Sequence, residues 1–286
     1  VEYWVKTTST PQGTDYGYFG GGGPSPSPVS TVDRIDYSSD TDTATAKGPL
    51  SSARNRLAAT GNASYGYFGG GGPSPSPVTT VDRVDYSNDT ATAAAKGPLS
   101  VARYFIAATG NASYGYFGGG VAPPSYSEKS TVDRIDYSSD TPTASPKGPL
   151  SAARRYLAAT GNASYGWFGG GAPGPSTMST VDRVDYSNDT ATAAAKGPLT
   201  VATNKFAATG NTSYGYFGGG SPGPKSTVSR IDYSNDTPTA STKGPLSGAN
   251  RYMGAASSRA NALPTTTNIT AANIINPDSE TGSGYW

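Results

Sequence analysis

A sequence repeat that recurs five times constrains the fold of this chain more than any other feature. A YG(Y/W)FGGG block begins at Tyr16, Tyr65, Tyr114, Tyr165 and Tyr214, at spacings of 49, 49, 51 and 49 residues. Two further blocks, V(D/S)R(I/V)DYS(S/N)DT and KGPL(S/T), follow it in every copy. A fixed period of this length is typical of a fold that repeats one supersecondary unit.

Each unit has room for four short strands. In the third copy we expect strands over residues 103–108, 113–117, 131–137 and 143–145, each closed by Gly, Asn, Asp, Ser or Pro. No segment carries an apolar period of 3.6 residues over ten residues, which excludes helical repeats. Four antiparallel strands repeated around an axis form a propeller blade. The pattern therefore predicts an all-β fold, a β-propeller with four antiparallel strands per blade.

The number of blades is a separate question, which the ends of the sequence decide. Five clear repeats run from about residue 16 to residue 253 of the 286. A divergent last blade over residues 249–286, closed with residues 1–15, would make six blades. We predict six blades in a single domain over residues 1–286, with five blades and an appended tail as the alternative.

Composition excludes several classes of protein. The 38 glycines and 23 prolines argue against a helical bundle. Cysteine and histidine are absent, which removes disulfides, thiolate metal sites and the commonest general base. The 21 basic and 20 acidic residues create no global field for nucleic acid or an anionic membrane. No apolar run is long enough for membrane insertion. We expect no enzyme activity, no cofactor, no nucleic acid and no membrane insertion.

The order of these blocks resembles the kelch repeat over nearly the whole chain. The resemblance rests on Phe-Gly-Gly beginning at Phe19, on Arg-Ile-Asp-Tyr beginning at Arg34, and on PLSxAR ending at Arg54, Arg103 and Arg154. It implies a kelch-like propeller. Kelch blades usually carry a Trp after the turn that follows the third strand, and Thr or Ala stands there in this chain. We therefore expect Tyr and Leu to pack between the blades.

The amino-acid sequence of the repeat is also similar to that of repeats in virion and tail-fibre proteins of marine cyanophages. This resemblance implies a location on a virion surface or outside the cell, with other virion proteins as partners. It says little about mechanism.

Two recurring polar features have structural interpretations. The Asp and Arg of VDRID recur in nearly every copy, so we expect them to form pairs across strands or between blades. Asp36, Ser38 and Asp40 place oxygen atoms at alternate positions, as calcium loops do, but the same residues also form Asx turns. A calcium site there remains an alternative to the turn.

Differences between the copies gather on one expected face of the propeller. The loop between the second and third strands changes from GGGGPSPSPVS to GGGVAPPSYSEKS and GGGSPGPKS, and the start of the first strand changes from ARNRL to ARYFI and TNKFA. The turns TGNAS and YSSDT hardly change. Packing gives near-identical copies no reason to diverge on one face, so we predict a ligand face there.

Basic and aromatic residues make up the candidate site on that face. Arginine binds carboxylate, sulfate or phosphate bidentately, and tyrosine offers a flat surface with a polar tip. An acidic glycan would suit both, although some of these cations can instead serve packing inside the blades. The candidates are Arg54, Arg56, Arg103, Tyr104, Arg154, Arg155, Tyr156, Lys205, Arg251 and Tyr252 around the channel, with Tyr126, Lys129 and Lys225 on the outer loops.

The hypothesis that these features favour is a non-enzymatic adhesion module. It would be a receptor-binding propeller on a phage virion that recognises cell-surface glycan. The alternatives are a secreted cellular lectin, a kelch scaffold for protein partners and a structural virion component. Catalysis is disfavoured because the copper-radical oxidase site of kelch-like propellers needs His and Cys, and because the Glu base of sialidases has only Glu2, Glu128 and Glu280 to draw on.

Overall fold

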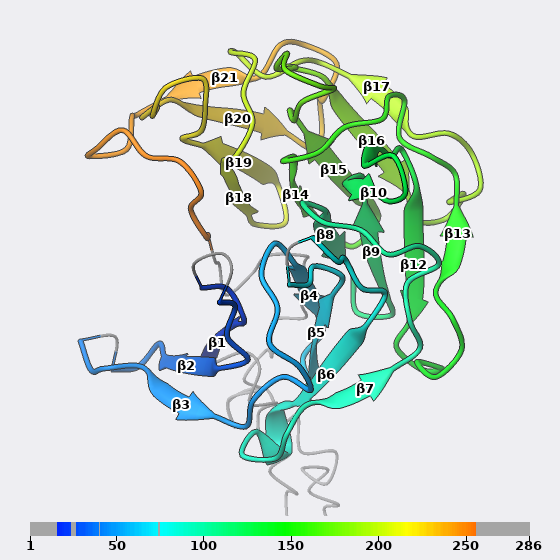
Figure 1. Ribbon diagram of the computed structural model, residues 1–286. Coiled ribbons are helices and arrows are strands. Elements are labelled where there is room, and N and C mark those ends of the chain that lie inside the picture. Colours follow the sequence, from blue (N-terminus) through cyan, green and yellow to red (C-terminus); the bar gives the residue numbers. More distant parts are fainter. Residues whose placement is uncertain (1–15, 24–26, 40, 74, 256–286) are drawn as a thin grey trace, which may run out of the picture.

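The computed structural model describes residues 16–23, 27–39, 41–73 and 75–255. These form five antiparallel blade sheets that follow one another around an axis, together with one small two-stranded sheet (Figure 1). We number the sheets as blades 1 to 5 in chain order. Four blades have four strands, and blade 1 has three in its described part. The all-β propeller predicted from the repeat is confirmed.

The strands of the blades are short and regular. Blade 1 contains β1 (Tyr16–Gly20), β2 (Val32–Asp36) and β3 (Thr45–Lys47). Blade 2 contains β4 (Ala58–Gly61), β5 (Tyr65–Gly69), β6 (Val81–Asp85) and β7 (Ala94–Lys96), with the 3-10 turn η2 (Tyr86–Asn88). Blade 3 contains β8 (Ala107–Gly110), β9 (Tyr114–Gly118), β12 (Val132–Asp136) and β13 (Ser145–Lys147), with the hairpin β10 (Val121–Ala122) and β11 (Ser127–Glu128). Blade 4 contains β14 (Ala158–Gly161), β15 (Tyr165–Gly169), β16 (Val181–Asp185) and β17 (Ala194–Lys196). Blade 5 contains β18 (Ala207–Gly210), β19 (Tyr214–Gly218), β20 (Val228–Asp232) and β21 (Ser241–Lys243).

The first and last strands of blade 3 differ from the sequence prediction. In blade 3 the inner strand begins at Ala107, not at residue 103, and the outer strand is Ser145–Lys147, not 143–145. Phe105 has a φ of 56°, which no extended strand can contain, so the strand starts after it. The two middle strands lie within a residue of their predicted bounds.

The described residues build five blades, and the predicted count of six is not matched. Residues 1–15 and 256–286, which were expected to supply the sixth blade, lie outside the described residues. Residues 250–255 are described and contain no strand, apart from one bridge between Asn250 and Lys225.

Aromatic and charged side chains join each blade to the next. Tyr116 of blade 3 stacks on Tyr186 of blade 4, with 4.6 Å between the ring centroids, and its hydroxyl donates to Asp189 at 2.9 Å. Arg134 and Lys147 of blade 3 reach the same carboxylate at 2.8 and 3.3 Å. Equivalent contacts join blades 1 and 2, 2 and 3, and 4 and 5. The expected pairing of the recurrent Arg and the packing through Tyr are therefore confirmed.

In blades 1 to 4, a glycine of the second strand contacts the phenylalanine of the following blade. A Cβ built on Gly118 would lie 2.7 Å from Cε1 of Phe168, so only glycine allows this approach. Phe168 is 0 % exposed, and Leu150 of the KGPL block is buried in the same cluster. The apolar core is thus divided into four clusters that lie between the blades.

Candidate ligand-binding face

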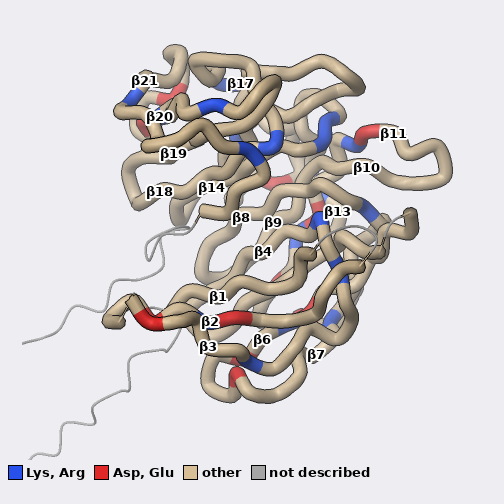
Figure 2. The backbone as a smooth tube through the Cα atoms, turned by 60° about the vertical axis from the view of Figure 1, so that its left-hand side comes forward, with Lys and Arg blue, Asp and Glu red and all other residues tan. Residues whose placement is uncertain are grey.

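The variable segments lie together on one face of the propeller. The loop between the second and third strands hydrogen-bonds to the connection that enters the next blade: Leu50 N–H donates to Ser30 O, and Arg54 N–H donates to Val29 O. The same pattern recurs at Leu150 and Arg154. The hairpin β10–β11, which belongs to the longest of these loops, stands out from the ring (Figure 2). We call this surface the variable face.

Three of the predicted rim arginines are buried instead of exposed. Arg54, Arg103 and Arg154 are each 0 % exposed. Each forms an ion pair inside its own blade, with Asp82 at 2.7 Å, Asp133 at 2.6 Å and Asp182 at 2.9 Å.

These arginines are buried because their side chains donate hydrogen bonds to backbone carbonyls inside the blade. Arg103 precedes the inner strand and turns inward, where it also donates to the carbonyls of Gly119 and Thr131 at 2.7 and 2.8 Å. Burial lowers the pKa of each guanidinium, and the nearby carboxylate opposes that shift. The expectation that these arginines ring the channel mouth is therefore wrong, because each of them pairs with a buried carboxylate inside its blade.

The residues two positions further along form a ring around the axis. Their backbones are joined by hydrogen bonds from each residue to its predecessor, of 3.0, 3.1, 3.0 and 2.7 Å. We call these residues the axial ring: Arg56, Phe105, Tyr156, Lys205 and Tyr252. Phe105 was not among the predicted site residues, although its position in the repeat matches that of Arg56 and Tyr156.

Every member of the axial ring has a left-handed backbone. The φ angles lie between 56 and 61°. Glycine adopts this conformation without strain, whereas other residues pay on the order of 1–2 kcal/mol. Glycine is frequent elsewhere in this repeat, yet this position holds Arg, Phe, Tyr, Lys and Tyr in the five copies. Strained non-glycine residues are frequent at ligand sites, which makes this ring a candidate site.

Each cation of the axial ring lies beside at least one aromatic ring of the next or preceding position. Arg56 lies over Phe105, 5.0 Å from its centroid, and the rings of Phe105 and Tyr156 are 4.1 Å apart. Lys205 lies between Tyr156 and Tyr252, 5.0 and 5.2 Å from their centroids. Burial raises the pKa of Tyr156, with Tyr252 adding to the shift, so its phenol remains a hydrogen-bond donor at neutral pH.

The other candidates surround this ring at different depths. Tyr104 is 3 % exposed, and its hydroxyl donates to Pro73 O at 3.0 Å. Arg155 lies 3.5 Å from Glu128, and Arg251 is exposed beside Tyr252. Tyr126 is exposed and donates to Pro75 O.

The two lysines of the outer loops make local contacts. Lys129 donates to Ser127 at 3.0 Å, and Lys225 donates to Ala202 O at 2.9 Å. Glu128 is the single acidic residue in the described loops and connections of this face. The same segments contain six cations besides the three arginines that form buried ion pairs. These cations are Arg56, Lys129, Arg155, Lys205, Lys225 and Arg251. The electrostatics of the variable face therefore favour an anionic ligand.

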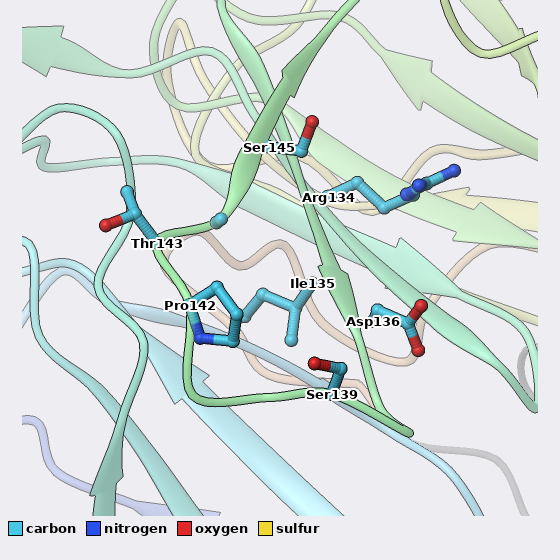
Figure 3. Close-up of a pocket in the computed structure, with 8 residues that line it drawn as sticks. Arg134, Ile135, Asp136, Ser139, Pro142, Thr143 and Ser145 are labelled. Atoms are coloured by element: carbon cyan, nitrogen blue, oxygen red, sulfur yellow. The ribbon is translucent and has the colours of Figure 1, made fainter.

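A shallow pocket lies near the turn between the third and fourth strands, away from the axis. In blade 3 it is lined by Arg134, Asp136, Ser139 and Pro142 among others (Figure 3), and an equivalent pocket recurs in blade 1. The Asp136 carboxylate accepts the hydroxyl and the amide of Ser138 at 2.6 and 2.9 Å, and the first of these bonds leads the lowering of its pKa. These contacts form an Asx turn.

The turn suggested for calcium has the same contacts. Asp36 accepts the hydroxyl and the amide of Ser38 in the same way, and Asp40 lies outside the described residues. Within the described ranges no three His, Cys, Asp or Glu side chains gather as metal ligands would.

No described helix is long and apolar enough to cross a membrane.

The left-handed backbone at the axis gives a direct prediction. Lys205→Gly should be more stable than Lys205→Ala by about 1 kcal/mol, because both lose the side chain and only alanine keeps the strain of a positive φ. Urea unfolding of the two variants measures this difference. At the exposed strand residue Ala94 the order should reverse, with Ala94→Gly less stable than the parent chain. A lower stability of Lys205→Gly than of Lys205→Ala would contradict the strain at this position.

Comparisons with known proteins define the fold and go no further. The solved structure of YjhT superposes with a TM-score of 0.70 and 12 % sequence identity, over 84 % of this chain and 84 % of that chain. No protein-family model matches the sequence, and no curated protein matches it. Fold and site together define a β-propeller with a basic and aromatic axial ring on its variable face.

Proposed function

We propose that this chain is a non-enzymatic binding module that takes an anionic sugar of a cell-surface glycan at its axial ring. The observation that carries the proposal is the ring of five strained, non-glycine residues in which Arg56 and Lys205 lie beside aromatic side chains. An aromatic face stacks on the apolar side of a sugar ring, and an adjacent Arg or Lys pairs with its carboxylate or sulfate. Both groups stand within one site here.

The biological setting is part of the same proposal. The repeat is similar in sequence to cyanophage virion repeats. The structural similarity to YjhT is consistent with a kelch-type propeller. A virion-surface or extracellular adhesin, held beside other virion proteins, would display many copies of this face. Weak single sites then gain strength from effective concentration.

The test is calorimetric titration of the purified chain with three oligosaccharides of equal length: sulfated, uronic acid and neutral. We expect binding of one or both anionic ligands, no binding of the neutral one, and a weakening of binding as the salt concentration rises. Arg56→Ala combined with Lys205→Ala should weaken binding by about tenfold or more, which corresponds to about 1.4 kcal/mol. Tyr156→Ala should also weaken it.

Two results would contradict the proposal. The first is equal binding of neutral and anionic sugars, since the cations would then have no part in recognition. The second is unchanged affinity of the Arg56→Ala/Lys205→Ala variant. Lys243→Ala serves as the matched control because it removes a cation from β21, outside the variable face.

A further inference from the structure

Blade 5 carries one side of the contact that joins each blade to the next, which we call the inter-blade joint. In each earlier blade a Tyr or Trp, an Arg and a Lys converge on one Asp of the following blade. The equivalent residues of blade 5 are Tyr216, Arg230 and Lys243, and within the described ranges none of them has a carboxylate partner. A Cβ on Gly244 would meet nothing within 4 Å, whereas the equivalent Gly148 is pressed against Ala191 of the following blade.

Blade 1 presents the other half of the joint. Phe19 is 46 % exposed, whereas its counterparts Phe68, Phe117, Phe168 and Phe217 are at most 4 % exposed. Tyr37 is 40 % exposed, whereas Tyr137 at the same position is 7 % exposed. Strand β1 also pairs on one side only in the described sheet. Two complementary half-joints therefore face an open side of the ring (Figure 1).

The chain enters this open side with the contacts that introduce every other blade. Gly220 N–H donates to Asn250 O at 2.8 Å, as Gly171 N–H donates to Thr203 O. Met253 packs against Gly219, as Leu157 packs against Gly119. A Cβ on Gly254 would lie 3.9 Å from Cε1 of Phe19, so the chain has reached blade 1 by this point.

We propose that the open side is a docking seat for this chain's own C-terminal segment, residues 256–286. The segment continues directly from Ala255, so its effective concentration at the seat is high. It also carries two acidic residues, Asp278 and Glu280, whereas Arg230 and Lys243 have no carboxylate partner among the described residues. One of these two carboxylates takes the place that Asp89, Asp140, Asp189 and Asp236 fill in the other joints.

The proposal concerns the joint of the ring and does not depend on what the axial ring binds.

Carbodiimide cross-linking of the full chain, followed by peptide mass spectrometry, tests the occupant. This reagent joins an amine directly to a carboxylate with which it is in contact. Lys47–Asp89, Lys96–Asp140, Lys147–Asp189 and Lys196–Asp236 lie 3.3 to 3.4 Å apart and serve as internal positive controls. We expect Lys243 to link to Asp278 or Glu280 with a yield similar to that of the controls.

Every other outcome overturns the proposal. A link from Lys243 to Asp40 within one chain would show that blade 5 closes directly on blade 1. The same link between isotope-labelled and unlabelled chains would show a second copy in the seat. A link to Glu2 or Asp15 would assign the seat to the N-terminal segment. If Lys243 forms no link while the four controls do, the seat lacks an acidic occupant.

Discussion

Asp133→Asn is expected to lower the free energy of unfolding by about 3–5 kcal/mol, since it leaves Arg103 as an uncompensated buried charge. Both side chains are 0 % exposed and 2.6 Å apart. The same carboxylate also accepts the hydroxyl of Ser100, so a second contact is weakened. Urea unfolding at pH 7, with the midpoint and slope fitted together, measures the loss.

The repeat itself supplies the control for this variant. Blade 5 carries Thr203 and Ser229 at the positions of the buried Arg and Asp, so the pair has been replaced there as a unit. Arg103→Thr/Asp133→Ser should therefore be markedly more stable than Asp133→Asn, because no charge stays buried without a partner. A double variant as unstable as the single one would show that the ion pair is not the source of the loss.

Gly97→Ala is expected to cost about 2–3 kcal/mol through overpacking between blades 2 and 3. The added Cβ would overlap the carbonyl of Pro142 and lie 2.8 Å from the carbonyl oxygen of Thr141. These are backbone atoms, so no side-chain rotation can relieve the contact. Gly97 N–H also donates to Asp140 O at 2.8 Å, and separation of the blades would break that bond.

Thermal unfolding of Gly97→Ala measures the cost of the overlap. Ala95→Ser in the adjacent outer strand β7 is the control, since Ala95 is exposed and its change should leave the midpoint unaltered. Equal midpoints for the two variants would contradict the close approach of the blades at Gly97.

The fold was predictable because the recurring sequence blocks mark where the middle strands of each blade begin. Tyr-Gly-(Tyr/Trp)-Phe-Gly and Val-(Asp/Ser)-Arg recur in all five copies, and the two middle strands of each blade begin at these blocks. The inner strand was misplaced because the segment from Arg103 to Phe105 contains apolar residues, while its left-handed φ has no signature without a glycine. The number of blades was also misjudged, since the divergent ends carry none of the repeat's blocks.

The candidate site was predictable in its face but not in its residues. Divergence among near-identical copies marked the correct segments, and loop contacts confirm that they share one face. The sequence does not distinguish Arg154 from its neighbour Arg155. In the structure Arg154 lies 2.9 Å from Asp182 inside the blade, whereas Arg155 lies near Tyr156 at the surface.

The sequence by itself determined the blade unit, its strand order and the face on which copies differ, since these follow from spacing and from local backbone chemistry. Tertiary structure alone decided which arginines are buried, that five left-handed residues meet at the axis, and that the described residues of blades 5 and 1 do not form the joint found between the other blades. Those features depend on contacts between residues far apart in the sequence: 30 positions for Arg103 and Asp133, and 55 for Arg134 and Asp189. No local pattern specifies such contacts, because the packing of whole blades brings the partners together.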